Sequence, residues 1–298
     1  MAVAWKTRQE RGNRRLIRLM AWVAESLGRP VARALLIPVC FYYLCRSGGA
    51  NQTLRQYYLR AQGGSPGWQG LFHHYYWFGT TILDRVYFLR GQFRLFDIRV
   101  NGIETLTRAL SLGRGCLLLG SHLGSFEVVR AMGVSREELD IKVLMDEENA
   151  PLMRAFFHEI NPAVAGSVLQ VGGIDNMLRV QECLEGGGIV GIMGDRLMSH
   201  DQVVRCNFLG SDAPFPTGSI RLAHVVRAPV VMFFGIYRGT NRYDVQLELL
   251  SEEIRLSSER RKDDIRRWTQ QYADRLAHYS RNATDNWFNF YDFWQDAP

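Results

Sequence analysis

The fold is decided by the stretch Cys116-Leu117-Leu118-Leu119-Gly120-Ser121-His122-Leu123-Gly124-Ser125-Phe126-Glu127, which lies within a chain of 298 residues. Its first five residues are almost wholly apolar, which is typical of a short buried strand. The polar residues come directly afterwards, where we expect a turn and then a helix over about 125–132. Because functional groups in open α/β sheets gather at the carboxyl ends of strands, His122 lies where chemistry is usually found.

The region that surrounds this stretch alternates in the same way. From about residue 96, short β-rich runs are followed by segments with helical character. This alternation predicts an α/β fold in which a mixed central sheet is flanked by helices. Strands are expected at 96–100, 116–120, 141–145, 167–171, 189–193, 229–237 and 243–249, and helices at 103–111, 125–132, 151–159, 175–185, 216–227 and 258–281.

The first 90 residues differ, because they are expected to be helical at 14–45, 52–62 and 67–90. Breaks are expected at Gly28-Arg29-Pro30 and at Pro38. Residues 31–45 are apolar or aromatic apart from Arg33, but they are fewer than the roughly 20 residues of a comfortable membrane span. A helix that lies in the membrane interface, or a short anchor, fits this length better. A buried helical hairpin around Pro38 is the alternative.

A basic segment precedes this apolar run and would face anionic lipid on the cytoplasmic side of a membrane. Its cationic residues are Lys6, Arg8, Arg11, Arg14, Arg15 and Arg18, against the single acidic residue Glu10. We therefore expect residues 1–90 to form a helical membrane-associating region. Residues 91–298 are expected to form the α/β core with its C-terminal helix.

The charge and the cysteines limit the classes of function. A formal net charge of +6 favours anionic partners, such as acidic lipids or an acidic carrier protein. No recognisable nucleic-acid-binding motif occurs, so nucleic acid is not an expected partner. The five cysteines form no CxxC pair and have no ligand spacing, so we expect a reducing compartment and no metal site.

His122 and Glu127 are the candidate catalytic residues. Five residues along a straight helix turn through about 500°, so the pair can meet only if a turn separates them. Glu127 would then accept a hydrogen bond from one imidazole nitrogen and orient the ring, and the other nitrogen would take a proton from a hydroxyl. The alternative is that a histidine and a glutamate lie near one loop by chance. A serine hydrolase is not favoured, because His122 occupies the centre of the would-be Gly-x-Ser-x-Gly elbow.

The His122-x4-Glu127 block after a strand resembles the His-x4-Asp/Glu block of the glycerolipid acyltransferase superfamily. It is most similar to the branch of bacterial lipid A late acyltransferases, which carry glutamate at the second position. Gly194-Asp195-Arg196 follows a strand where that branch has an acidic residue. The stretch from Phe208 to Ser219 resembles its Phe-x-Gly and Pro-x-Gly blocks, and the segment at 228–234 resembles its apolar strand after a proline.

Substrate-binding roles are also expected outside the His-x4-Glu block, at a strand end and at a helix start. Asp195 and Arg196 are expected to bind a phosphate or a carrier group, with a local ion pair as the alternative. Phe215-Pro216-Thr217-Gly218-Ser219 is expected to hold an anion or to shape the acyl entrance, with an ordinary helix start as the alternative. The candidates are therefore Asp195, Arg196, Phe215, Pro216, Gly218 and Ser219.

Some segments depart from the family pattern. Ser121 stands where asparagine is common, and Asp195-Arg196 replaces a frequent Asp-Gln pair. The aromatic C-terminus at 286–294 resembles relatives outside the lipid A pathway, including acyltransferases of aryl polyene-type gene clusters. We expect this C-terminus to pack on the core, with lipid contact as the alternative.

The resemblance implies a membrane-associated O-acyltransferase on the cytoplasmic face of a bacterial inner membrane. The donor would be acyl carrier protein or acyl-CoA, and the acceptor a hydroxyl of a lipid or glycolipid. Neither a metal nor another cofactor is expected besides the acyl thioester co-substrate. The alternative is a non-catalytic lipid-binding membrane protein on the same scaffold.

Overall fold

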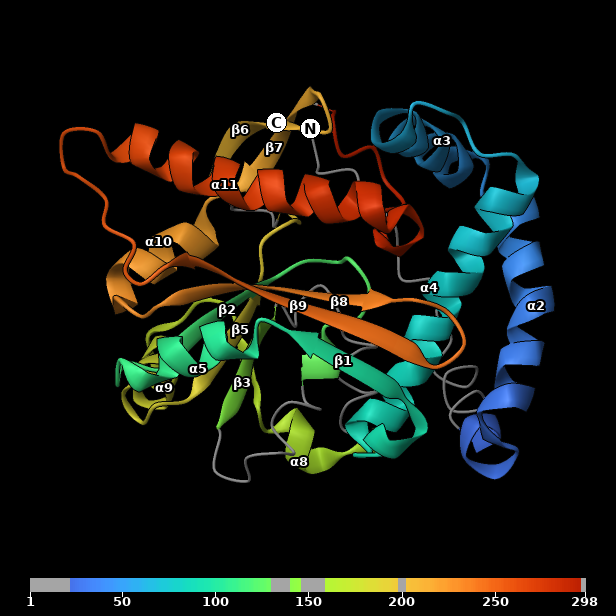
Figure 1. Ribbon diagram of the computed structural model, residues 1–298, viewed down its shortest axis with the longest axis horizontal. Coiled ribbons are helices and arrows are strands. Elements are labelled where there is room, and N and C mark those ends of the chain that lie inside the picture. The colour runs from blue at the N-terminus through green and yellow to red at the C-terminus, as the bar shows by residue number, and fades with distance from the viewer. Residues whose placement is uncertain (1–21, 130–139, 146–158, 198–201, 296–298) are drawn as a thin grey trace.

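A seven-stranded sheet forms the centre of the computed structural model, which describes residues 22–129, 140–145, 159–197 and 202–295 (Figure 1). The basic segment before residue 22, and all but the last residue of the helix expected at 151–159, lie outside the described residues. In spatial order the strands are β1 (Asp97–Asn101), β9 (Arg242–Ser251), β8 (Val230–Tyr237), β2 (Cys116–Gly120), β5 (Ile189–Met193), β3 (Ile141–Met145) and β4 (Val168–Gln170).

The sheet is mixed, as the sequence predicts. The strands β8, β2, β5, β3 and β4 pair in parallel, whereas β9 pairs antiparallel with β8 and parallel with β1. In the pairing of β2 with β5, Gly120 lies opposite Met193. The carboxyl ends of these two strands therefore lie at the same edge of the sheet, and the residues that follow them can meet.

Helices cover both faces, which explains why β2 is apolar throughout. Leu117 and Leu119 belong to an apolar cluster with side chains of α9, α10 and α11, while Cys116 and Leu118 belong to a second cluster with side chains of α2, α4 and α5. Successive strand residues point to opposite faces, so a strand covered on both sides needs no polar positions. The helices are α2 (Gly28–Arg46), α3 (Gly48–Gln62), α4 (Trp68–Leu89), α5 (Ile103–Ser111), α8 (Pro162–Ala165), α9 (Ile174–Glu185), α10 (Gly218–Val226) and α11 (Arg261–Asn282).

A hairpin of β6 (Val203–Phe208) and β7 (Ser211–Pro216) was not among the predicted strands. Its two-residue loop places Leu209 at φ 54° and Gly210 at φ 84°, which are the positive values of a tight hairpin turn. Leucine is an unusual residue at the first of these positions, so the turn signal was weak. The helix predicted from residue 216 accordingly begins at Gly218, because Pro216 still belongs to β7.

The N-terminal helices lie at one end of the molecule, with α2 on the outside of α4 (Figure 1). The predicted interruption near residue 28 is present as a turn at Leu27, but α2 continues through Pro38, so the predicted break there is wrong. The alternative of a hairpin around Pro38 is excluded for the same reason. Of the described residues, no helix is both long and apolar enough to cross a membrane.

A buried ion pair joins α2 to α4 and to the sheet. Arg29 donates from Nε and Nη2 to the two carboxylate oxygens of Asp84, at 2.7 and 2.8 Å. The Tyr243 hydroxyl on β9 donates to the same carboxylate at 2.8 Å. Asp84 has no exposed surface, so these donors replace the water that its charge would otherwise require.

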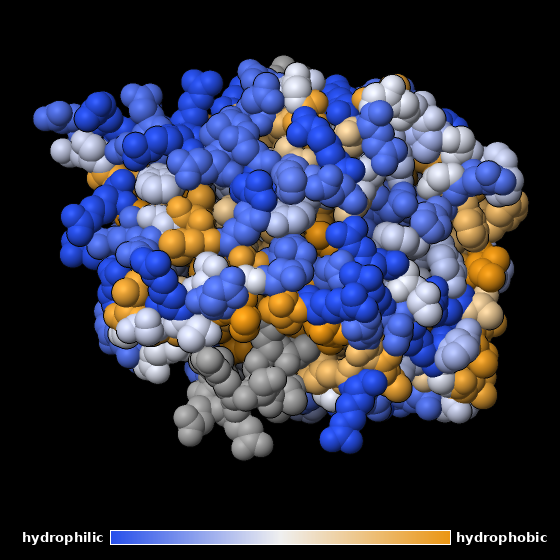
Figure 2. All heavy atoms as spheres, viewed as in Figure 1, coloured by the Kyte–Doolittle hydropathy of each residue, from blue (hydrophilic) through white to orange (hydrophobic). Residues whose placement is uncertain are grey.

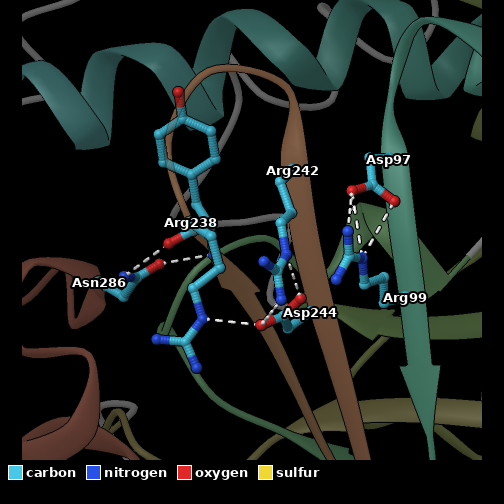
Figure 3. A network of polar contacts seen from close by, with 7 residues as sticks. Asp97, Arg99, Arg238, Arg242, Asp244 and Asn286 are labelled. Carbon is cyan, nitrogen blue, oxygen red and sulfur yellow. Dashed lines mark hydrogen bonds and ion pairs between the residues drawn. The ribbon is translucent and has the colours of Figure 1, made fainter.

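Removing the cation from this pair tests how far it holds α2 in place. We expect Arg29→Ala to lower the free energy of unfolding by about 3–5 kcal/mol, because the Asp84 carboxylate stays buried without its partner. The matched control is Arg99→Ala, whose ion pair with Asp97 is exposed on β1 (Figure 3). Chemical denaturation of both variants should show a lower free energy of unfolding for Arg29→Ala only. Equal losses would contradict the interpretation.

Candidate active site

Two loops at one edge of the sheet bring the candidate residues together. His122 lies two residues beyond the end of β2, and Asp195 lies two residues beyond the end of β5. Because Gly120 pairs with Met193, these equal offsets place the two side chains next to each other. The loops after β2 and β5 thus bring His122 and Asp195 together at one edge of the sheet.

The carboxylate that orients His122 is that of Asp195. Nδ1 of His122 lies 2.8 Å from Oδ1 of Asp195, and the backbone N–H of His122 donates to Oδ2 at 2.9 Å. Because a carboxylate can only accept, Nδ1 is the protonated nitrogen of a neutral ring. The Asp195 side chain is 1% exposed and the His122 side chain 24% exposed, so the histidine is the partner that a substrate can reach.

The prediction that Glu127 accepts a hydrogen bond from His122 is wrong, because His122 is bonded to Asp195 and the Glu127 carboxylate has other partners. Glu127 instead pairs with Arg85 of α4, whose Nε lies 3.0 Å from Oε2. The Ser125 hydroxyl donates to the same oxygen at 3.2 Å. Glu127 lies in a 3-10 turn over Glu127–Val129, which is later than the predicted helix start at Ser125; residues 130–132 are outside the described part.

The charges around His122 keep it neutral and keep Asp195 ionised. Burial and the positive charge of Arg196 lower the pKa of His122, and they outweigh the raising effect of Asp195. Arg85 also lowers it. Burial alone would raise the pKa of Asp195, but the electrostatic interaction and hydrogen bonds with His122, together with the charge of Arg196, hold it below its ordinary value. The pair is thus a neutral imidazole on an ionised carboxylate.

The loop after β2 runs so close to β8 that glycine is required in it. Gly124 has φ 74°, and a Cβ added there would lie 1.9 Å from the carbonyl oxygen of Gly235. In the structure Ser125 N donates to that oxygen at 2.8 Å. A side chain at Gly124 would therefore displace the loop that carries both His122 and Glu127.

The C-terminal segment, residues 284–294, also contacts this loop. The Trp287 indole N–H donates to Oδ2 of Asp195 at 3.1 Å, and Phe288 N donates to the carbonyl oxygen of His122 at 3.0 Å. The Asn286 side chain is bonded to the backbone N–H and carbonyl of Tyr237 at the end of β8 (Figure 3). Trp287 is 1% exposed, so the prediction that this segment packs on the core is confirmed for it.

The other predicted site residues are placed differently. Arg196 lies near His122 and donates from Nη2 to the carbonyl oxygen of Phe288 at 2.9 Å. Asp195 was expected to meet a phosphate, but its carboxylate is buried and bonded to His122 and Trp287. Phe215 and Pro216 are buried in β7, and the Phe215 ring packs on Tyr272 of α11. Gly218 is exposed and Ser219 half-buried at the start of α10.

Arg85 was missed by the sequence reasoning, although a signal existed. Asp84 and Arg85 are the only Asp, Glu, Lys or Arg residues of the 22-residue α4, so their charges in an apolar helix indicate buried partners. Asp84 forms the structural ion pair with Arg29, and Arg85 forms an ion pair with Glu127 in the site. In the part of the chain that the structure describes, no group of three or more His, Cys, Asp and Glu residues could hold a metal ion.

This arrangement can act as a general base. The Asp195 carboxylate fixes the tautomer of His122, which leaves Nε2 as the nitrogen that can accept a proton. Arg85 and Arg196 add positive charge beside the ring, where an anionic group or a developing oxyanion would be stabilised. Glu127 compensates the charge of Arg85 and limits its movement.

Residues 84–296, which make up well over half of the chain, match the family model described as "Bacterial lipid A biosynthesis acyltransferase". The match begins at Asp84 and includes Arg85, both loops of the site and the C-terminal segment. A comparison with curated proteins found no match.

Proposed function

The chain belongs to the bacterial lipid A biosynthesis acyltransferase family, and we propose that it transfers a fatty acyl chain from an acyl thioester to a hydroxyl of a lipid or glycolipid. The family supports an acyltransferase that acts on lipid. The observation that carries the mechanism is the hydrogen bond of 2.8 Å between Nδ1 of His122 and the buried carboxylate of Asp195. This bond prepares a neutral, partly exposed imidazole for proton transfer.

The proposed reaction is a direct displacement at the thioester carbonyl. Nε2 of His122 takes the proton of the acceptor hydroxyl while its oxygen forms a bond with the carbonyl carbon. The resulting oxyanion collapses and the carbon–sulfur bond breaks. His122 then donates its proton to the leaving thiolate and returns to its neutral form. The products are an ester and a thiol. The ionised Asp195 stabilises the imidazolium between these steps.

The arginines support an anionic substrate at the site. Arg196 and Arg85 both lower the pKa of His122 through their charge, so their charges act on the imidazole. This positive charge would stabilise an anionic group of a substrate, or the oxyanion that develops at the thioester carbonyl. Acyl carrier protein is our proposed donor, since its acidic surface complements the net charge of +6. Acyl-CoA is the second candidate donor.

Membrane association is proposed from the outer face of α2. Val31, Leu35, Phe41 and Tyr42 are 42%, 43%, 54% and 59% exposed, and Ala34, Pro38 and Cys45 are exposed on the same side. These positions recur every three or four residues, so they form one stripe along the helix, which we call the α2 stripe. Figure 2 shows hydrophobic side chains along the edge of the molecule where α2 lies.

The α2 stripe fits a helix that lies in the membrane interface. Its inner face, with Ala32, Leu36 and Cys40, is buried in the protein. The helix is thus apolar on two sides, which a water-exposed helix does not require. We propose that the protein works at the cytoplasmic face of the bacterial inner membrane, where the acyl thioester and a lipid hydroxyl are both accessible.

Two substitutions at the site test the reaction. We expect His122→Ala to lower the rate of acyl transfer by about 10²–10⁴-fold, because the general base is lost. Asp195→Asn should fall in the same range, since an amide N–H facing Nδ1 favours the wrong tautomer, roughly as in catalytic triads. Transfer is measured from labelled acyl carrier protein to extracted lipid acceptors by mass spectrometry. His278→Ala, which alters an exposed histidine on α11, is the matched control.

The same assay decides between an enzyme and a lipid-binding protein on this scaffold. A non-catalytic protein would consume no thioester, and its lipid binding would not change in His122→Ala. Wild-type protein that releases no free thiol from either donor, or an active His122→Ala variant, would contradict the proposed function.

Vesicle binding tests the role of the α2 stripe. The pair of substitutions Leu35→Asp and Phe41→Asp should weaken binding to phosphatidylethanolamine/phosphatidylglycerol vesicles by at least about tenfold, because two apolar side chains no longer enter the interface. The control pair is Ile174→Asp and Val225→Asp, which are 81% and 68% exposed but belong to α9 and α10. Flotation should show weaker binding for the α2 pair only; equal behaviour of the two pairs would refute the assignment.

A further inference from the structure

The indole of Trp287 is bonded to the carboxylate that orients His122. Its Nε1–H donates to Oδ2 of Asp195 at 3.1 Å, while Oδ1 accepts from Nδ1 of His122 at 2.8 Å. Trp287 and Asp195 are each 1% exposed, so water does not compete for these bonds. The indole therefore holds one oxygen of the carboxylate while the other oxygen holds the imidazole.

We propose that Trp287 is a positioning residue for acyl transfer, which acts by fixing the rotation of the Asp195 carboxylate so that Nε2 of His122 faces the acceptor hydroxyl. This inference rests on the proposed function. It assigns a role in the reaction to the aromatic C-terminal segment, at a position far from the His-x4-Glu block in the sequence.

The surroundings of Trp287 hold the indole in one orientation. Its ring centroid lies 5.0 Å from that of Tyr57, 5.1 Å from that of Phe208 and 5.1 Å from that of Phe293. Its backbone forms an antiparallel bridge with Leu123, directly after His122. Because the Trp287 indole is fixed both through its ring and through its backbone, its N–H can hold the Asp195 carboxylate in one orientation.

The C-terminal segment also holds the loop after β2 that carries His122. Phe288 N donates to the carbonyl oxygen of His122 at 3.0 Å, and Gly124 N donates to the carbonyl oxygen of Asn286 at 2.8 Å. Asn286 in turn is bonded to the end of β8 (Figure 3). The C-terminal segment thus contacts His122 through its backbone and Asp195 through the Trp287 indole. One segment of the chain therefore positions both members of the pair.

Trp294 provides a matched control within the same aromatic cluster. Its ring centroid lies 6.0 Å from that of Trp287, and its indole N–H donates to the carbonyl oxygen of Phe208 at 3.2 Å. Trp294→Phe therefore removes a hydrogen-bonding indole from the same cluster without touching Asp195. A purely structural role would make the two tryptophans behave alike.

A double-mutant cycle tests the proposal on the full chain under single-turnover conditions. Trp287→Phe should lower the rate of acyl transfer by about tenfold or more, because a hydrogen bond to a charged group is lost. The concentration that gives the half-maximal rate should stay within about twofold, since the buried indole is out of reach of the substrate. In an Asp195→Ala background Trp287→Phe should have no further effect, because there is no carboxylate to position. Trp294→Phe should leave the rate near that of wild type.

A second variant covers the case in which Trp287→Phe loses stability. Benzothienylalanine at position 287 keeps the bicyclic shape and replaces the N–H with sulfur, so the packing is preserved and the donor alone is removed. We expect the same loss of rate, with a smaller fall in melting temperature than Trp287→Phe causes, because the packing of the ring is kept.

A normal rate for the benzothienylalanine variant, or an equal effect of Trp287→Phe with and without Asp195, would overturn the proposal. These results differ from a failure of the proposed function, in which wild-type protein itself would release no thiol from the thioester.

Discussion

The structure of the site depends on one buried carboxylate, that of Asp195. A carboxylate removed from water stays ionised only if donors replace the lost hydration. Here the donors are Nδ1–H and the backbone N–H of His122 and the indole N–H of Trp287. They come from the loop after β2 and from the C-terminal segment, so the charge can be accommodated only once β2, β5 and the end of the chain have assembled.

A comparison with Asp84 shows why only one of two buried aspartates serves chemistry. Both accept hydrogen bonds at each carboxylate oxygen. The partner of Asp84 is an arginine, which does not lose its proton near neutral pH, so that pair can only hold elements together. The partner of Asp195 is a histidine that is 24% exposed and keeps a second nitrogen. A buried, hydrogen-bonded carboxylate thus holds α2 in position at Asp84 and prepares His122 as a base at Asp195.

Much of the fold could be predicted from local pattern. The strands at 116–120, 141–145 and 189–193 and the helix at 103–111 have the predicted bounds, because short apolar runs and amphipathic periods depend on nearby residues alone. The hairpin of β6 and β7 was missed because Leu209 occupies a turn position that usually takes asparagine or glycine. The α2 helix tolerates Pro38, which the local rule for proline does not anticipate.

The site was only partly predictable, for a different physical reason. The position of His122 follows from the strand that precedes it, but the identity of its carboxylate partner depends on which strand lies beside β2. That neighbour is β5, and only the pairing of Gly120 with Met193 shows that equal offsets bring His122 and Asp195 together. Spacing along the chain favoured Glu127, which instead pairs with Arg85. The contact of Trp287 depends on tertiary packing and leaves no local signal.

Asp195, and not Glu127, sets the tautomer of His122. The ¹⁵N NMR spectrum of protein labelled in its seven histidines measures this directly at about pH 8, where imidazoles are neutral. The His122 signals are assigned by their absence in His122→Asn. We expect a protonated Nδ1 and an unprotonated Nε2, a pattern that is lost in Asp195→Asn and retained in Glu127→Gln. Loss of the pattern in Glu127→Gln with retention in Asp195→Asn would contradict this assignment.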